Sequence, residues 1–401
     1  MQYGENIVQL EEKTGETKRS SLMLTIFILM NFVITMMSSV FSGILDKIAV
    51  SLSVSIANAG LLNTMFFYGG AFGVPITLIV FRKIERTKMM NIMLLITILS
   101  TLALVLTGNY TLLLLIRLIM GISANSYGTL ATAVVLSLTD NERQGRTMAL
   151  YITGAALANI IGTSLTRALS SVLDWRSIFW ILNMVMTSSL IYFKINLPQS
   201  QDSPAKVSIK NQLGLLKSRK TLLVLASTLI IFMGNGAFFN YITPYLLTLS
   251  PSLEPAMSFI LFLQGAASFI GNLIGGHISD RIGFARSLLV GSAFQLALIV
   301  FIIAFRNIAW VSVMLTILWS MNIWFLGLQI NTGIVQVTNN NSLMMSFKNS
   351  ALQLGGAMGS SMAAMVISLS DIRVTTYITL LTSIVLLAMQ LVSVKKLSYL
   401  R

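Results

Sequence analysis

Acid–base and metal-binding side chains are scarce in this chain, and their positions restrict the chemistry it can perform. The 401 residues contain thirteen aspartates and glutamates, one histidine and no cysteine. All thirteen carboxylates fall in predicted tails, loops or helix ends, so no buried carboxylate pair is available for catalysis. Without cysteine, disulfides and thiolate sites are excluded, and no zinc, serine-hydrolase or P-loop pattern occurs. The sequence therefore predicts no enzyme, no catalytic residue, no metal site and no cofactor.

The remaining composition indicates that lipid surrounds the elements that must position these groups. Hydrophobic residues make up 55% of the chain and charged residues 10%, against about 25% charged in soluble domains. Apolar runs long enough to cross a bilayer core of about 30 Å recur along the sequence. Residues 1–20 are polar and mixed in charge, unlike a signal peptide. They are interpreted as a cytoplasmic tail.

Lysine and arginine residues are crowded in alternate loops of the chain, whose net charge is +14. The crowded loops lie near 82–88, 143–146, 206–220 and 281–286, and the last residues are basic as well. By the positive-inside rule these loops and both termini are cytoplasmic. The positive charge is thus interpreted as a sign of topology and of contact with anionic lipids, not of nucleic-acid binding.

Twelve membrane-spanning helices are predicted from the apolar runs, which makes the fold class an all-α membrane protein. The first six lie near residues 22–45, 54–80, 89–107, 110–137, 147–170 and 176–196. The second six lie near residues 221–249, 256–278, 285–305, 307–335, 343–369 and 374–394. The predicted organisation is a tail (1–20), a six-helix bundle (21–196), a cytoplasmic linker (197–220), a second six-helix bundle (221–394) and a C-terminal tail (395–401).

The two sets of six helices show a weak internal repeat. Gly73 and Gly271 each stand nine residues before a charged loop residue, and 198 residues separate them. At an offset of 197, three small residues match three others: Ala158, Gly162 and Ser164 match Gly355, Gly359 and Ser361. Two matches at nearly one offset favour duplication, which is a transporter architecture, and chance is the alternative. The matched glycines are predicted to pack helices closely.

A charged segment with regularly placed glycines follows the predicted eighth helix. It reads Gly276-His277-Ile278-Ser279-Asp280-Arg281-Ile282-Gly283. Its glycines allow a close helix approach and a tight turn, and Asp280 can pair with Arg281 or with a neighbouring helix end. The segment resembles the G-x-x-x-D-R-x-G signature of the major facilitator superfamily, and an ordinary charged loop boundary is the alternative. The resemblance implies a gating role for Gly276, Asp280, Arg281 and Gly283.

The corresponding loop of the first half departs from that signature. Arg82 stands where the signature has aspartate, and Glu85 stands where it has the second glycine. Arg82 and Lys83 are kept as candidate gating residues. The small residues from Gly162 onward resemble the antiporter signature of the fifth helix, with Ser164 in place of the expected proline. This resemblance is to the twelve-helix drug, sugar and purine efflux branch of the superfamily.

Arg117 is the most informative residue of the predicted fourth helix. The stretch Arg117-Leu-Ile-Met-Gly121 matches the R-x-x-x-G signature of the same branch, in which this arginine is linked to proton transfer or gating. A cation inside a membrane helix is costly unless it faces water or a partner. Arg117 and Gly121 are therefore candidates for coupling and transport. An arginine that snorkels to the lipid headgroups is the alternative.

Proton coupling is implied by the resemblance but has few candidate carriers. A proton antiporter needs a group that titrates between its two facing states. Relatives in this branch carry an acidic residue in the first helix, where this sequence has Ser38. Asp46, at the far end of that helix, is the carboxylate closest to the expected cavity mouth. His277 is interpreted as a solvated interface residue.

Uncharged polar and aromatic side chains collect on the helices that the resemblance places around a cavity, namely the first, fourth, seventh and tenth. Amide and indole groups hydrogen-bond and stack, which suits a neutral planar or amphipathic ligand better than a polyanion. For each residue alone, hydrogen bonding between helices is the alternative. The predicted cavity residues are Asn31, Asn125, Asn235, Asn240, Tyr241, Trp319, Asn322, Trp324, Gln329 and Asn331.

Together these features predict a secondary transporter of a bacterial inner membrane. It is expected to export a small neutral or amphipathic molecule, such as a drug, sugar, purine or nucleoside, by alternating access. A proton gradient is the implied driving force. The expected partners are the substrate and membrane lipids, with no nucleic acid, and the chain is expected to act as a monomer. A membrane receptor on the same fold and an uncoupled facilitator are the alternatives left open.

Overall fold

The computed structural model describes residues 2–81, 84–139, 143–197, 214–339 and 341–398, so Arg82 and Lys83 lie outside the described residues. Every regular element of this part is helical. The N half consists of α1 (Gln2–Ser51), α2 (Ile56–Val80), α3 (Arg86–Leu106), α4 (Tyr110–Ser137), α5 (Gln144–Leu169) and α6 (Trp175–Asn196). The C half consists of η1 (Gly214–Lys217), α8 (Arg219–Phe239), α9 (Ile242–Leu249), η2 (Pro251–Ala256), α10 (Met257–Ile282), α11 (Phe284–Ala304), α12 (Ala309–Thr338), α13 (Ser342–Leu369), η3 (Ile372–Val374) and α14 (Thr375–Ser398).

The length and hydropathy of the helices fit a membrane. Eleven segments within the described residues are long and apolar enough to cross a bilayer. The remaining long helix is α2, which has 25 residues and therefore rises about 37 Å, but holds Asn58, Asn63 and Tyr68 among its apolar residues. Because α8 and α9 follow one another as a single interrupted span, the helices confirm the prediction of a twelve-helix membrane protein.

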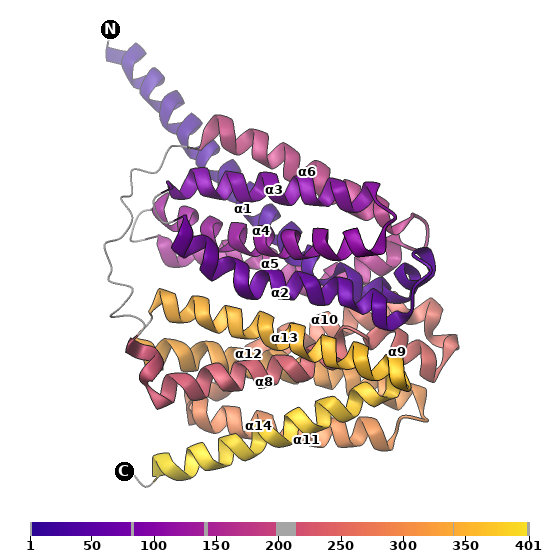
Figure 1. The fold of residues 1–401 in the computed structure, drawn as a ribbon. Helices are drawn as coiled ribbons and strands as arrows, with labels where there is room; N and C mark the ends of the chain where they lie inside the picture. Colours follow the sequence, from indigo (N-terminus) through magenta and orange to yellow (C-terminus); the bar gives the residue numbers. More distant parts are fainter. Residues whose placement is uncertain (1, 82–83, 140–142, 198–213, 340, 399–401) are drawn as a thin grey trace.

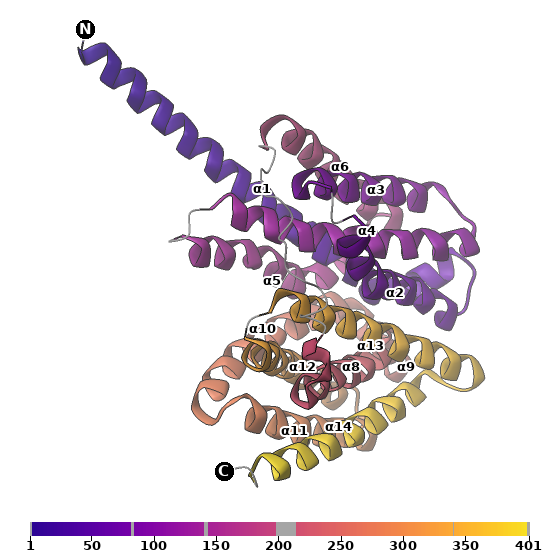
Figure 2. The same cartoon turned by 60° about the vertical axis from the view of Figure 1, so that its left-hand side comes forward.

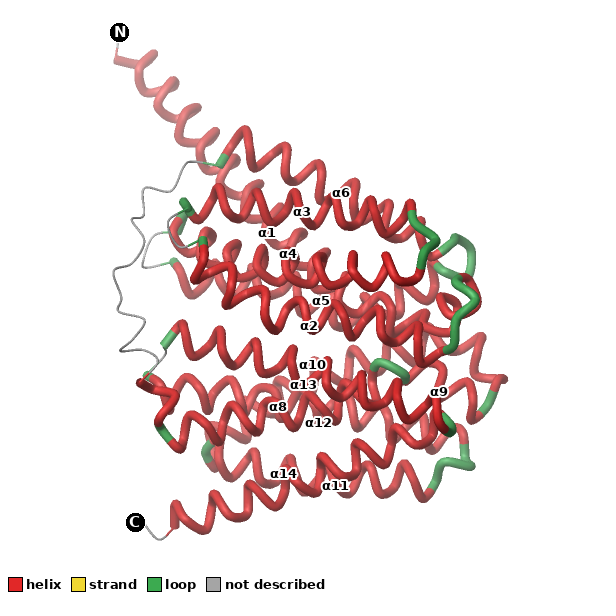
Figure 3. The backbone as a smooth tube through the Cα atoms, viewed as in Figure 1, coloured by secondary structure: helices red, strands yellow, loops and turns green. Residues whose placement is uncertain are grey.

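The two halves form separate groups of helices that lie side by side (Figures 1 and 2). In Figure 1 the N half is the upper group and the C half the lower group. Both chain termini lie at one end of the bundle, which we call the terminal end, and the opposite end is the distal end. Figure 3 shows that short loops join the helices at the distal end.

Equivalent helices of the two halves pack by equivalent close contacts. Gly73 of α2 lies against α4, where an added Cβ would come within 2.7 Å of Ile122 Cα. Gly271 of α10 lies against α12, where an added Cβ would come within 1.9 Å of the carbonyl oxygen of Met321. A side chain does not fit at either contact. The two contacts therefore agree with the repeat predicted from the spacing of these glycines.

Two spans are interrupted near the distal end. α1 bends at Ile44, whose φ of −132° and ψ of 24° are not helical. The helix predicted over 221–249 divides into α8 and α9 at Asn240 and Tyr241. Pro244 explains this second break, because a proline lacks the N–H that would bond to the carbonyl four residues earlier and its ring clashes with that carbonyl. Both breaks lie where the two halves meet.

Candidate functional site

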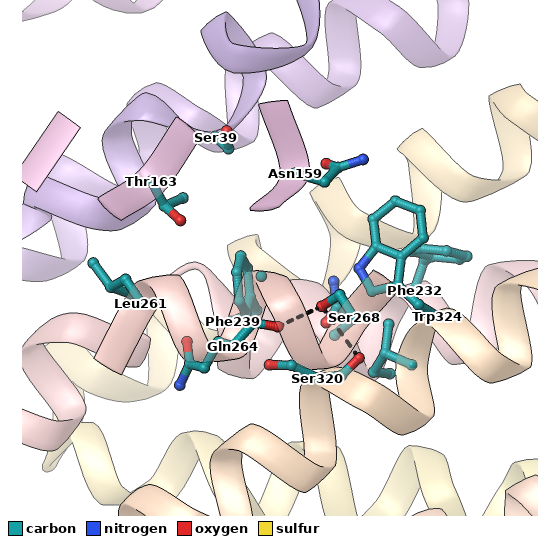
Figure 4. Close-up of a pocket in the computed structure, with 13 residues that line it drawn as sticks. Ser39, Asn159, Thr163, Phe232, Phe239, Leu261, Gln264, Ser268, Ser320 and Trp324 are labelled. Atoms are coloured by element: carbon teal, nitrogen blue, oxygen red, sulfur yellow. Dashed lines mark hydrogen bonds between the residues drawn. The ribbon is translucent and has the colours of Figure 1, made fainter. Parts of the chain in front are cut away.

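A cavity lies between the two halves. The empty space between the lining residues, including the part open to solvent, is about 560 Å³. The N half lines it with Ser39 of α1 and with Asn159 and Thr163 of α5. The C half lines it from α8, α10 and α12 with Phe232, Asn235, Phe239, Leu261, Gln264, Gly265, Ser268, Ser320, Ile323 and Trp324 (Figure 4).

The cavity lining is polar but uncharged. It combines hydroxyl groups, carboxamides and three aromatic rings, and no Asp, Glu, Lys, Arg or His side chain is among the described residues that line it. Within the described part of the chain there is also no cluster of three or more potential ligands for a metal ion. Such a lining can hydrogen-bond and stack with a neutral ligand, and it offers no counter-charge for an ion.

Two carboxamides face the cavity from opposite halves. Asn159 of α5 and Asn235 of α8 are both half-buried and line the cavity, and neither has a hydrogen bond recorded among the described residues. Near them, α5 and α10 approach so closely that a Cβ on Gly265 would lie 2.2 Å from the carbonyl oxygen of Ile160. A ligand that bonds to both amides would therefore connect the two halves beside a tight helix contact.

Buried hydrogen bonds join the halves on the distal side of the cavity. The Asn63 amide of α2 donates to Asn240 Oδ1 at 2.9 Å, and the Ser42 hydroxyl of α1 lies 3.3 Å from the same oxygen. The Thr243 hydroxyl donates to the carbonyl oxygen of Ser42, just before the bend in α1, at 3.0 Å. All four side chains are buried, so water competes little for these bonds. They close the distal end in this structure.

One buried arginine links carboxylates of both halves at the same end. Arg167 of α5 donates to Asp46 of α1 at 2.6 Å, and its other terminal nitrogen bonds to Glu254 of η2 in the C half. The Arg167 side chain is 2% exposed and that of Glu254 is 48% exposed. Asp46, a predicted coupling residue, is thus a partner in an ion-paired closure that spans the interface between the halves and reaches solvent on one side.

Arg117 lies inside the N half and does not line the cavity. Its side chain is fully buried, and its guanidinium carbon lies 4.3 Å and 4.5 Å from the ring centroids of Phe41 and Phe66. It donates to the carbonyl oxygen of Leu62 and to Asn63 Oδ1, both at 3.1 Å. No carboxylate pairs with it among the described residues. By holding the Asn63 oxygen, Arg117 turns the Asn63 nitrogen toward the C half.

Contacts between α2, α4 and α13 continue the interface toward the terminal end. The Thr64 hydroxyl donates to Ser360 Oγ at 2.7 Å. Nearer the middle of the helices, the Gln353 amide donates to Asn125 Oδ1 at 2.7 Å. Among the described residues, no hydrogen bond between the halves is recorded closer to the terminal end than this last one. In the part of the chain that the structure describes, the hydrogen bonds between the halves therefore lie at the distal side and in the middle of the molecule.

The charged motif at the terminal end is solvent-exposed. Gly283 has a φ of +80° and joins α10 to α11, a conformation that favours glycine. Asp280 and Arg281 are exposed, and neither forms an ion pair with another described residue. Gly276 is nearest to Leu328, at 3.8 Å from an added Cβ, within the same half. No hydrogen bond or ion pair joins Asp280 or Arg281 to a described residue of the N half.

Most of the residues predicted to line the cavity lie elsewhere. Trp324 and Asn235 line it, while Asn125 and Asn240 make the bonds between halves described above. The others hold helices together within one half: Asn31 donates to the Tyr151 carbonyl, Tyr241 to the Ser360 carbonyl, Asn322 to Gln295, and Gln329 to the Gly275 carbonyl, while Asn331 accepts from Lys348 and Trp319 packs edge-on against Phe238.

Some residues of interest are absent from the sequence-based prediction. The cavity residues Asn159 and Thr163 come from the fifth helix and Gln264 from the eighth, and the resemblance did not place these helices around a cavity. Lys348 of α13, which is 6% exposed, donates to Asn331 Oδ1 at 2.7 Å. A polar residue inside an apolar run is the signal that could have identified each of them.

The predicted packing glycines, Gly162, Gly355 and Gly359, and the predicted coupling residue Gly121 differ in how closely neighbouring helices approach them. An added Cβ would lie 2.1 Å from a backbone oxygen at Gly121, 2.3 Å at Gly355 and 1.8 Å at Gly359, so these three positions require a residue without a side chain. At Gly162 the nearest atom would be Met36 Cγ at 3.5 Å, an ordinary contact. Three of the four glycines thus set the distance between neighbouring helices.

Comparisons with known proteins agree with this architecture. Residues 27–360 match the family model of the Major Facilitator Superfamily. The uncharacterized MFS-type transporter YbcL of Bacillus subtilis is 26% identical over 357 residues, covering 88% of this chain and 90% of that protein. A probable sugar efflux transporter of Helicobacter pylori is 24% identical over 334 residues, covering 81% of this chain and 83% of that protein.

Solved structures share the fold. The nucleoside transporter NupG, in a mutant form, matches with a TM-score of 0.73 at 13% identity, over 92% of this chain and 99% of that chain. An inward-facing, occupied bacterial homologue of the human lysosomal transporter Spinster matches with a TM-score of 0.74 at 13% identity, over 94% and 97%. Because the family model covers most of the sequence and the fold agrees with it, this chain belongs to the Major Facilitator Superfamily of membrane transporters.

Proposed function

We propose that this protein exports a small neutral or amphipathic molecule, of the drug, sugar or nucleoside classes, by alternating access across a bacterial inner membrane. The observation that carries the proposal is the uncharged cavity between the halves, which is closed by hydrogen bonds at the distal end. The family assignment supports transport. Relatives named as sugar efflux transporters support export and a neutral substrate.

The proposed orientation puts the terminal end in the cytoplasm. Basic residues begin or end the helices there, among them Arg86, Lys88, Arg143, Arg146, Lys220, Arg281 and Arg286, and the positive-inside rule supports this assignment. With the distal end closed, the cavity would then face inward. We propose a monomer as the working unit, surrounded by lipid and without a nucleic-acid partner.

Export would require the distal closure to exchange with a closure at the terminal end. The bonds of Asn240 and the ion pairs of Arg167 connect the halves and must break for the cavity to open outward. The exposed Asp280 and Arg281 are then available to form contacts at the terminal end. A ligand that bridges the halves would favour the exchange only by binding the intermediate arrangement more tightly than the inward-facing one.

The second candidate function concerns whether transport is coupled to a proton gradient. No ionisable side chain lines the cavity among the described residues, and this observation favours an uncoupled facilitator as the second candidate function. Proton antiport would use the carboxylates nearest to the path, Asp46 and Glu254, which the outside solution would reach once Arg167 releases them. In that case protons would bind at the distal closure and not beside the substrate.

A flux experiment tests the proposal. Everted vesicles that contain the protein are given a pre-formed pH gradient and radiolabelled uridine, D-ribose or ethidium. Uptake at least fivefold above vesicles without the protein is expected for one probe, and it should fall in Trp324→Ala but not in Trp310→Ala, whose tryptophan is 66% exposed outside the cavity. Dissipation of the gradient during uptake would indicate proton antiport, and uptake without it a facilitator. Binding without uptake would overturn transport in favour of a receptor.

A further inference from the structure

Gln264 is a buried amide in the cavity wall with only one of its two ends bonded. Its side chain is 2% exposed and lines the cavity; Figure 4 shows it on the C-half wall, across the cavity from Thr163 and Asn159. Its Nε2 donates to the hydroxyl of Thr316 in α12 at 3.1 Å. Its Oε1 has no hydrogen-bond partner among the described residues. A buried acceptor without a donor is rare in folded proteins and calls for an explanation.

The orientation of this amide follows from its neighbour. The Thr316 hydroxyl carries one hydrogen, which it donates to the carbonyl oxygen of Val313 at 2.8 Å. Thr316 Oγ1 accordingly accepts from the Gln264 amide nitrogen in this structure. The group that Gln264 leaves unpaired at the cavity wall is thus an acceptor.

The hydroxyl groups nearby are acceptors for the same reason. Ser268 donates its hydrogen to the carbonyl oxygen of Gln264 at 2.8 Å, Ser320 to that of Thr316 at 3.1 Å, and Ser39 to that of Met36 at 3.2 Å. Each hydroxyl has a single hydrogen, so lone pairs are what these side chains still offer. The C-half side of the cavity therefore has an acceptor wall, formed by Gln264, Ser268 and Ser320, which favours hydrogen-bond donors from its ligand. Ser39 of the N half adds an acceptor from the opposite side.

Building on the proposed transport function, we infer that this acceptor wall binds a vicinal pair of hydroxyl groups, and that Gln264 Oε1 accepts a hydrogen bond from one of them. A free sugar and the ribose of a nucleoside share this chemistry. The rings of Phe232, Phe239 and Trp324 supply an apolar surface for the face of a sugar ring or base. The wall discriminates against ligands that lack the hydroxyl pair, because their binding leaves the buried acceptors unpaired.

The test compares ligands with and without the hydroxyl pair on two matched variants. Purified protein in proteoliposomes is assayed by counterflow of radiolabelled uridine, with unlabelled uridine, D-ribose and 2′,3′-dideoxyuridine as competitors and ethidium uptake measured in parallel. The variant is Gln264→Met, which keeps the length of the side chain. The control is Gln329→Met, since Gln329 is also buried, donates to the Gly275 carbonyl at 2.9 Å and leaves its Oε1 unpaired, but does not line the cavity.

The wild-type protein should prefer uridine to 2′,3′-dideoxyuridine by at least tenfold, and Gln264→Met should reduce this preference to below about threefold. Gln329→Met should keep it. Competition by D-ribose would identify a free sugar as the ligand, and competition by uridine alone would identify a nucleoside. If Gln264→Met does not fold, Thr316→Val provides the same test, because it releases the amide that Thr316 holds and should reduce the preference without touching the ligand.

Three results would overturn the inference. A Gln264→Met protein that binds both nucleosides more weakly in equal proportion would show that Gln264 only supports the fold. An unchanged preference in both Gln264→Met and Thr316→Val would show that the acceptor is not used. Transport of ethidium or 2′,3′-dideoxyuridine without recognition of any hydroxylated probe would refute the acceptor wall while leaving transport in place. Absence of flux for every probe would instead refute the proposed transport function, and the inference with it.

Discussion

The distal and terminal ends of this transporter are held by different interactions. At the distal end, buried amides and hydroxyls bond across the interface, and Arg167 bridges Asp46 and Glu254 of opposite halves. At the terminal end, Asp280 and Arg281 are exposed and unpaired among the described residues. Among the described residues, those that join the two halves in this structure are therefore not those of the recognisable sequence motif. We expect the motif to act in another state.

The two arginines of the distal closure lie at different depths in the molecule. Arg117 is connected to the C half through two hydrogen bonds: it donates to Asn63, and Asn63 donates to Asn240. Arg167 sits at the interface itself and reaches the solvent through Glu254. A transporter must pass between states that differ in free energy by a few kcal/mol. Each of these bonds contributes part of that difference, and mutation can measure its contribution.

The absence of native cysteine allows a single cysteine introduced at Asn159, in the cavity, to report the opening of the distal end by its labelling rate.

Arg167→Met should give the largest opening of the distal end. It leaves Asp46 and Glu254 without their shared cation, and the loss of one partner of a buried ion pair is worth up to about 3–5 kcal/mol, reduced here because Glu254 is half-exposed. The labelling rate of Asn159→Cys by a membrane-impermeant maleimide from the distal side should rise about 30-fold or more. Arg373→Met, which removes an ion pair within the C half, is the control. Equal effects of the two variants would contradict the assigned role of Arg167.

Arg117→Met should raise the labelling rate of Asn159→Cys from the distal side about tenfold and lower the thermal stability of the N half. The substitution removes the side-chain bond to the Leu62 carbonyl and leaves the buried Asn63 oxygen without the donor that holds it, which together cost about 1–3 kcal/mol. Labelling from the distal side and the unfolding temperature in detergent measure the two effects. Arg117→Lys should not restore either, because a lysine cannot donate to both groups and stack between Phe41 and Phe66. Full restoration by lysine would mean that only the charge matters.

Asn240→Ala should have an intermediate effect. Its side-chain oxygen accepts from Asn63 and Ser42 at the interface, and two lost bonds of about 1 kcal/mol each predict a five- to tenfold rise in labelling from the distal side. Asn322→Ala, which removes an equally buried amide inside the C half, should leave the labelling rate unchanged. A similar rise in both variants would point to general loosening of the helices.

Asp280→Asn should have the smallest effect on the distal closure. Because Asp280 is exposed and forms no ion pair with a described residue, its neutralisation should change labelling from the distal side by less than about twofold. Flux should fall all the same if the motif stabilises the outward-facing state. A large rise in distal labelling would show that the motif already supports the state described here.

The fold was predictable because it depends on local patterns. The prediction of a helix over 110–137 matches α4, which starts after the capping residue Asn109 and contains one apolar run. The break at Asn240 was missed although Pro244 signals it. The paired helices followed from the offset between Gly73 and Gly271, whose close contacts are equivalent in the two halves.

The cavity was less predictable because helical periodicity does not identify the face that meets the other half. Gln264 and Gln329 are both buried amides on membrane helices, with the same single bonded end, yet only Gln264 lines the cavity. Lipid-facing, packed and cavity-facing surfaces are all largely apolar. The partner of Arg117 was not predictable either, since Asn63 is brought to it by the tertiary packing of α2 against α4.

The most direct test of the distal closure compares the labelling of Asn159→Cys from the two sides of the membrane. Everted and right-side-out vesicles are treated with the same impermeant maleimide, and Ser252→Cys, at an exposed position of the distal end, fixes the orientation. With the distal end closed, Asn159→Cys should react at least tenfold faster from the terminal side than from the distal side. Equal labelling from both sides, or faster labelling from the distal side, would contradict a cavity that is closed by the bonds of Asn240 and Arg167.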